Sequence, residues 1–550
     1  MGHLFFYLAV VAAALLWSAT FVAAAARTGR PWLHRLLVAA AVIVPPLALV
    51  PWVGLTALLA FGANIRANWF APTLTALVSA VVGGLWILRA GLAREDARGG
   101  RVAARWPVIG LAAMVAMAQA VAFGTLLFID NAVAAQGRML RVEASQLMLA
   151  HLPPQPLPDD DAAPLYLRVL PALEADRTFF DGAGPAAQPL TTDIAAPEVA
   201  AGLARHAATL DLLRRAADRP GCRFVRDWSR PSLDLLLPEV QHMRRAAKLL
   251  VLAARRESAD GDAAAAVRDV VRLRRVAEHA AAEPILICGL VGQAIDALAL
   301  ETLADVLPRL QQADRAVLDD TALRDFVETP IAFDRHFLGE EAFGLATLAD
   351  LADGRSGASA GRLFESVEGA AVPSEVLVAE PVSLLFRSFL LPADVAGYRR
   401  IMGLYERCVT GNQPPRPFPA MREQCSEIEQ ELRGRSPGIL TRMLVPALDS
   451  CLRAEAAGRA RHRAAEVLVA ATRARLETGA VPATLDELVS DRFPAVPRDP
   501  FTTDRPLLAK RSEGNLVVYS VGPDGEDDGG PAPAGAGQQG NDDVGVRLAL

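Results

Sequence analysis

Four apolar stretches open the chain, at residues 4–26, 36–61, 70–88 and 107–129. Each is close to the ~20 residues that an α-helix needs to cross the hydrocarbon core of a bilayer. None of them contains an acidic residue, a lysine or an arginine. The pattern therefore predicts a four-helix transmembrane bundle in residues 1–130, with the lipid bilayer as its first partner.

After residue 130 the apolar positions recur three and four residues apart, as in Leu236, Val240, Met243 and Ala247. This spacing places them on one face of an α-helix. We therefore predict a mainly α domain built of helical hairpins over residues 131–437. Its helices are expected at 162–176, 198–218, 232–258, 261–281, 284–307, 313–328, 376–411 and 420–434.

The pattern changes again in the last hundred residues. A long helix is expected over 438–478, where Pro446 is a possible kink because proline removes a backbone donor. Two short runs at 507–510 and 516–520 have the composition of strands, and the Gly514 between them suits a hairpin. Residues 438–550 are therefore expected to form a small α+β domain.

The arginines around the apolar stretches predict an orientation. The first and third loops between the spans together hold eight arginines, whereas the second loop holds only Arg66. Cytoplasmic loops carry the excess of basic residues. The protein is therefore predicted to lie in the cell (inner) membrane, with residues 131–550 outside the cytoplasm.

The charge balance bears on the partners. Residues 1–129 carry nine arginines and two acidic residues, which leaves −13 for the remainder of a chain whose net charge is −6. An acidic domain without a basic, aromatic-rich run argues against nucleic acid as a partner. Other proteins of the cell envelope are the more natural partners.

All five cysteines follow the apolar region, at positions 222, 288, 408, 425 and 451. No two of them form a C-x-x-C pair, so the sequence indicates neither a zinc nor a thioredoxin-like site. Cys408 and Cys425 flank a proline-rich turn and would face each other across a helical hairpin. A disulfide between them is permitted outside the cytoplasm.

Two motifs are compatible with catalysis or metal binding. Gly357–Gly361 matches G-x-S-x-G around Ser359, but no apolar strand precedes it, so the strained elbow that activates such a serine is not expected. His336 and Glu340 stand four residues apart on a predicted helix, without an identifiable third metal ligand. We therefore predict that the protein is not an enzyme.

The tail resembles the C-terminal domain of the major pseudopilin of type II secretion systems. Gly479 and Pro482 match its G-x-x-P element, and the run 499–501 matches its D-P-aromatic element. Ser520, Gly522, Asp524, Gly525, Gly529 and Gly530 match its S-x-G-x-D-G loop, with one extra residue before the last glycines. The resemblance implies that the long helix packs on a small sheet.

The resemblance also implies a calcium site, because the loop of that family binds one Ca²⁺ through aspartate side chains and backbone carbonyls. Five carboxylates are available for it here. The expected metal ligands are Asp524, Asp527, Asp528, Asp542 and Asp543. Three features depart from the family: the processed prepilin start is absent, the tail follows a membrane region, and residues 531–540 lengthen the loop.

The sequence thus predicts a membrane-anchored, extracytoplasmic scaffold or interaction protein with a pseudopilin-like tail. An association with a type II secretion-like envelope system is implied by the resemblance. Two alternatives stay open: an envelope hydrolase with a site in the helical domain, and a transporter subunit. Ionisable residues inside the spans would favour transport, but the spans offer little beyond Gln119.

Overall fold

The computed structural model describes residues 24–25, 27–33, 36, 131–231, 237–352, 391–409, 416–433, 441, 446–512, 514–531 and 542–549. The four predicted spans lie outside these residues, apart from residues 24, 25 and 36. The chain divides into two compact units, residues 1–140 with 348–393 and residues 141–347 with 394–550. We call the second the helical-sheet unit. The predicted domain limits at 130 and 437 stay a prediction.

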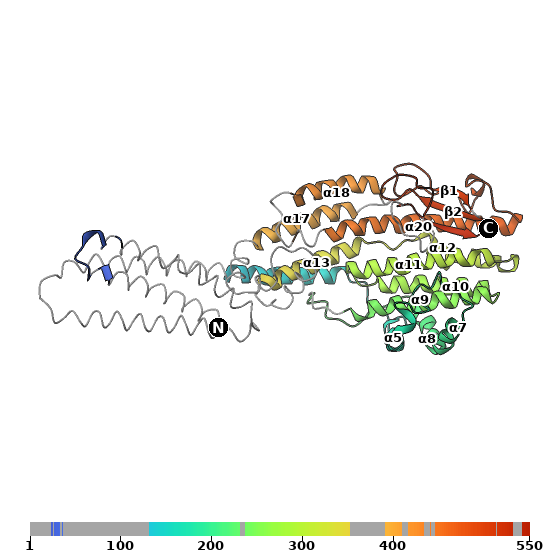
Figure 1. The fold of residues 1–550 in the computed structure, drawn as a ribbon, viewed down its shortest axis with the longest axis horizontal. Coiled ribbons are helices and arrows are strands. Elements are labelled where there is room, and N and C mark those ends of the chain that lie inside the picture. The colour runs from blue at the N-terminus through green and yellow to red at the C-terminus, as the bar shows by residue number, and fades with distance from the viewer. Residues whose placement is uncertain are drawn as a thin grey trace. The chain divides into compact units, whose positions relative to one another are not determined.

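The mainly α prediction is confirmed for the described residues, as is the small C-terminal sheet (Figure 1). A further helix spans residues 131–151. The further helices before residue 353 are α5 (Ala163–Ala175), α6 (Arg177–Phe180), α7 (Pro197–Arg205), α8 (Ala207–Ala217), α9 (Pro238–Ala259), α10 (Ala263–Ala280), α11 (Leu286–Val306), α12 (Thr321–Glu328) and α13 (Asp334–Ala352), with 3-10 helices η1 (Leu307–Arg309) and η2 (Gln312–Asp319). After residue 390 follow α17 (Leu391–Val409), α18 (Phe418–Arg433), α20 (Pro446–Thr478) and η4 (Asp486–Leu488).

Local chemistry explains most of these boundaries. The turn between α9 and α10 has Gly261 at φ +95°, and the carboxylate of Asp262 then caps α10 by accepting from the amide of Ala265 at 2.9 Å. α20 is described from Pro446, and proline fits the first turn of a helix, where its missing N–H has no intrahelical partner.

Two predicted helices are divided in the structure. The helix expected over 198–218 is interrupted at His206, which separates α7 from α8. The helix expected over 313–328 consists of η2 and α12, with the Asp320 carboxylate capping α12 at the junction. Periodicity spans both breaks because an interruption of one residue hardly displaces the apolar face.

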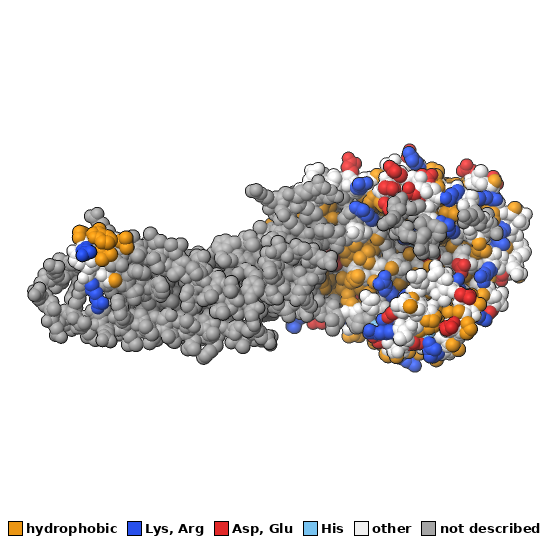
Figure 2. All heavy atoms as spheres, in the orientation of Figure 1, with side chains coloured by type: hydrophobic (Ala, Val, Ile, Leu, Met, Phe, Trp, Pro, Cys, Tyr) orange, Lys and Arg blue, Asp and Glu red, His pale blue; other side chains and the backbone are white. Residues whose placement is uncertain are grey.

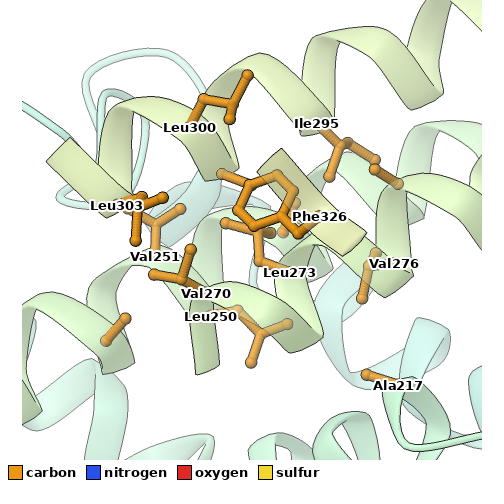
Figure 3. Close-up of a cluster of buried hydrophobic side chains, with 14 of the residues drawn as sticks. Ala217, Leu250, Val251, Val270, Leu273, Val276, Ile295, Leu300, Leu303 and Phe326 are labelled. Carbon is orange, nitrogen blue, oxygen red and sulfur yellow. The ribbon is translucent and has the colours of Figure 1, made fainter. Parts of the chain in front are cut away.

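The core of the helical-sheet unit lies between α9, α10, α11 and α12. Figure 3 shows Leu250 and Val251 of α9 facing Leu273 of α10 and Leu303 of α11, with Phe326 of α12 beside them. All five are at most 3% exposed. Burial of such side chains stabilises a fold by about 1.5–3 kcal/mol each, so these contacts are the main apolar stabilisation of this unit.

Three strands form one antiparallel sheet in the order β1 (Leu508–Ser512), β2 (Asn515–Ser520) and β3 (Val544–Ala549). The hairpin pairs Leu508 with Tyr519 and Ser512 with Asn515. The hairpin was predicted, but the third strand was not. β2 and β3 pack on α20, and β3 also packs on α11, so the sheet shares the core of the helices (Figure 1).

Within the described residues, one helical segment is long and apolar enough to cross a membrane, Leu286–Arg309, and 67% of its apolar window is buried. This segment is α11 with η1, and it lies between α9, α10 and α20. Its apolar character is accounted for by this central position in the core.

Candidate functional site

The acidic loop that carries the predicted metal ligands begins where β2 ends. Gly522 has φ +69°, and a Cβ atom placed on it would lie 1.9 Å from the carbonyl oxygen of Asp542. Only glycine fits such a close approach of two backbones. The start of the loop is therefore held directly against the segment that enters β3.

Two aspartates on the first side of the loop are engaged in its own turns. Asp524 accepts a hydrogen bond from the amide of Glu526 at 3.0 Å. Asp527 accepts from the Tyr519 hydroxyl at 3.0 Å and from the amide of Gly529 at 2.9 Å. Burial and the Asp527 carboxylate raise the pKa of Tyr519, which keeps its hydroxyl a donor.

The other aspartates join the two sides of the loop. Asp528 accepts from the amide of Asp542 at 3.1 Å, and Asp543 accepts from the amide of Gly530 at 2.6 Å. Burial raises the pKa of the Asp543 carboxyl. These bonds order the loop ends through carboxylate–amide contacts.

The structure does not test the calcium prediction. Among the described residues, no group of three or more His, Cys, Asp or Glu side chains is placed to hold a metal ion. Calcium takes six to eight oxygen ligands, so backbone carbonyls and water would have to complete the shell. The metal-binding roles of the five aspartates stay a prediction.

Asp499, from the D-P-aromatic element, fixes the base of the same loop. Its side chain is 2% exposed and accepts from the amide of Phe501 at 2.8 Å, the amide of Val521 at 3.0 Å and the Ser520 hydroxyl at 2.6 Å. A buried carboxylate needs such donors. The motif therefore ties the segment after α20 to the end of β2.

A buried polar network joins the helices to α20. The Asp296 carboxylate of α11 accepts from Arg274 Nη1 of α10 at 3.1 Å, and it lies 2.6 Å from His462 Nε2 of α20. His462 Nδ1 lies 3.2 Å from the carbonyl of Val327, and Arg274 Nη2 donates to the carbonyl of Thr329 at 2.6 Å. The Arg274, Asp296 and His462 side chains are at most 5% exposed.

A second buried histidine lies among the helices before α11. His279 Nε2 is 3.1 Å from the carbonyl of Arg219, an acceptor, so Nε2 carries the proton. Nδ1 then accepts from the Tyr166 hydroxyl at 2.9 Å. Burial lowers the pKa of His279 to about 3. This arrangement uses a neutral imidazole as a structural bridge between α5 and α10.

His336 and Glu340, the predicted i, i+4 pair, each form a hydrogen bond to the backbone of a neighbouring segment. His336 donates from Nε2 to the carbonyl of Ala281 at 2.9 Å, and a Glu340 oxygen accepts from the amide of Leu286 at 3.4 Å. Burial lowers the pKa of His336 to about 4 and raises that of Glu340 to about 7. Within the described residues no third ligand joins them.

The remaining candidates from the sequence are the cysteines and Ser359. Cys288 is buried, and burial raises the pKa of its thiol, so the thiol is a core group. Ser359 lies outside the described residues. The side chains of Cys408 and Cys425 also lie outside the described set, and their disulfide stays a prediction.

Comparison of the chain with protein-family models, with curated proteins and with solved structures finds no match. The pseudopilin resemblance therefore rests on the motifs of the tail, and it stays a prediction.

Sequence reasoning missed the buried charges of α20 and its partners. Glu455, Arg459 and His462 recur at intervals of four and three residues, a spacing that would equally fit a solvated polar face. The available signal was the small residues Ala456, Gly458 and Ala460 among them, because small side chains permit a close helix neighbour.

Proposed function

We propose that the protein is a membrane-anchored scaffold whose helical-sheet unit binds other proteins of the cell envelope outside the cytoplasm. The observation that supports this most is the integration of the pseudopilin-like tail, because α20 and the sheet share one core with α9–α11. A tail built into a large helical body offers a rigid surface, in contrast to a flexibly tethered module.

The surface of the unit is consistent with this proposal. On the face seen in Figure 2, basic and acidic side chains are intermingled over helices and sheet. Charge of mixed sign suits specific protein contacts better than binding to a nucleic acid backbone. Association with a type II secretion-like system is part of the proposal and is supported by the tail motifs alone.

Topology tests the location. A reporter that is active only outside the cytoplasm is expected to work when fused after residue 150 or at residue 66, and to be silent at residue 98. The reason is the bias of eight arginines against one between the loops. Activity at 98 with silence after 150 would invert the topology and remove the envelope role.

Native electrophoresis of the protein from its own membranes tests the scaffold. The wild-type chain is expected in an assembly larger than itself, and Asp499→Ala is expected to lose that assembly because it loosens the base of the loop. Ser359→Ala is the control and should leave the assembly intact. Migration of the wild-type chain alone would contradict the scaffold, and labelling of Ser359 by a fluorophosphonate would favour the hydrolase.

We also propose calcium as a ligand of the acidic loop, supported by its five aspartates and its positive-φ glycines. The melting temperature of the full-length protein is expected to be higher in calcium than in chelator. At a hundredfold excess over the dissociation constant, the stabilisation would be about 2.7 kcal/mol. Asp524→Ala should remove most of it. Equal melting temperatures in millimolar calcium and in chelator would exclude the site.

A further inference from the structure

α20 turns a stripe of ionisable side chains toward the interior of the unit. Glu455, Arg459 and His462 lie on one side of the helix, at intervals of four and three residues. α11 runs beside α20 (Figure 1). Its Gln293 lies against Gly458 of α20, and its Asp296 lies against His462. His462 is hydrogen-bonded to Asp296, but the end of the stripe nearer the start of α20 is not satisfied in this way.

Arg459 has buried hydrogen-bond donors that are not satisfied. It is only 4% exposed. Its Nη1 donates to the carbonyl of Arg416 at 3.0 Å, whereas Nε and Nη2 are buried and have no hydrogen-bond partner. These two nitrogens form one edge of the guanidinium plane, with two N–H groups pointing the same way. Such a fork matches the two oxygens of a planar oxyanion.

Gln293 brings a further donor to α20 beside Gly458, the neighbour of Arg459 in the chain. A Cβ atom on Gly458, the residue before Arg459, would lie 2.9 Å from Gln293 Nε2. The amide group of Gln293 therefore rests against α20 at the level of Arg459. Its Nε2 is also buried without a hydrogen-bond partner. Burying unpartnered donors costs free energy, so the arrangement points to a missing acceptor.

Glu455 does not supply that acceptor. It stands one turn before Arg459, yet its Oε2 is buried without a hydrogen-bond partner. This oxygen therefore accepts no hydrogen bond from Nε or Nη2 of Arg459. Burial raises the pKa of Glu455 and lowers that of Arg459. Because its raised pKa favours the neutral form, the Glu455 carboxyl repels an anion bound at Arg459 less than a carboxylate would.

We propose that the open edge of Arg459, together with Gln293, is the recognition group of a buried binding site for a small monocarboxylate. This site goes beyond the proposed scaffold function and does not depend on it. A monocarboxylate fits because it is planar, offers two oxygens to the fork and brings one negative charge to one guanidinium. The ligand must be small, because the unpartnered atoms are closed off from solvent.

The full-length protein in detergent tests this site by thermal unfolding in formate, acetate or chloride at constant ionic strength. Formate or acetate is expected to raise the melting temperature saturably, and chloride is not. Arg459→Gln should abolish the rise. Arg453→Gln, at an exposed position of the same helix, is the matched control and should retain it.

Gln293→Leu keeps the proposal testable if Arg459→Gln does not fold. It removes one donor to the anion and no charge, so the carboxylate should bind about tenfold more weakly. No saturable rise in the wild-type protein, or an unchanged affinity in Gln293→Leu, would overturn the site. A crystal structure grown with formate that holds only water at the Arg459 edge would overturn it as well.

Discussion

α11 is held by different chemistry on its two sides. Toward α9 and α10, Leu303 lies beside Val251 and Val270 in an apolar core (Figure 3). Toward α20, the contact includes buried polar groups centred on Asp296, which joins His462 of α20 to Arg274 of α10. Apolar packing tolerates small shifts, whereas a buried charge needs each of its partners. The attachment of α20 should therefore be the more specific and the more easily broken of the two.

The largest effect is expected from Asp296→Ala. It leaves Arg274 and His462 buried without their shared carboxylate, which costs about 3–5 kcal/mol. Chemical denaturation of the full-length protein measures the loss. Asp305→Ala on the same helix is the control, because the Asp305 side chain is 42% exposed and pairs with Arg255 at the surface. That change should cost no more than about 1 kcal/mol.

Hydrogen exchange then shows which side of α11 opens. In Asp296→Ala, amides of α20 and the sheet should lose protection while those of α9, which has no polar contact with Asp296, keep it. Uniform loss over all of these elements would mean that the two sides unfold together, and the contrast between them would be wrong.

Asp499→Ala is expected to have a smaller effect, confined to the sheet. It removes one acceptor from three donors, those of Phe501, Ser520 and Val521. One hydrogen bond to a charged group contributes about 1.5–3 kcal/mol, so we expect a loss of at least about 2 kcal/mol from the three together. The exposed Asp504→Ala is the matched control in the same denaturation series. A loss of equal size in both variants would contradict the role of Asp499.

The two sides of α11 also differ in how far the sequence predicts them. The periodicity of apolar residues predicted α10, α11 and the end of α9 to within a few residues, and glycine marked the turn at Gly261. These are local signals, and the core between the helices follows from them. The hairpin of β1 and β2 was found in the same way.

What the sequence did not reveal depends on contacts between distant segments. Arg459 and His462 have the spacing of a solvated face, and contacts with α11, α12 and Arg416 bury them. β3 is short and contains Gly545 and Arg547, so its strand character comes from pairing with β2. The tail motif identified Asp499, but its hydrogen bonds to Ser520 and Val521 required the folded structure.

Two of the buried histidines, His279 and His462, give the smallest test of the comparison. His462 faces a carboxylate, whereas His279 is a neutral bridge whose pKa burial lowers to about 3. An unfolded histidine titrates near pH 6.5, so the unfolded chain binds the proton first as the pH falls. The contribution of His279 is therefore complete above pH 6.5 and is lost as the pH falls toward 3.

Between pH 6.5 and 5.5 this loss amounts to about 1 kcal/mol. His279→Gln should lose that much less stability than the wild-type protein over the same interval, when both are measured by urea denaturation. Tyr166→Phe is the control, because it removes the hydroxyl partner but keeps the imidazole buried, which is the main cause of the lowered pKa. Its dependence on pH should follow the wild type. If His279→Gln also followed the wild type, the imidazole of His279 would not be held neutral.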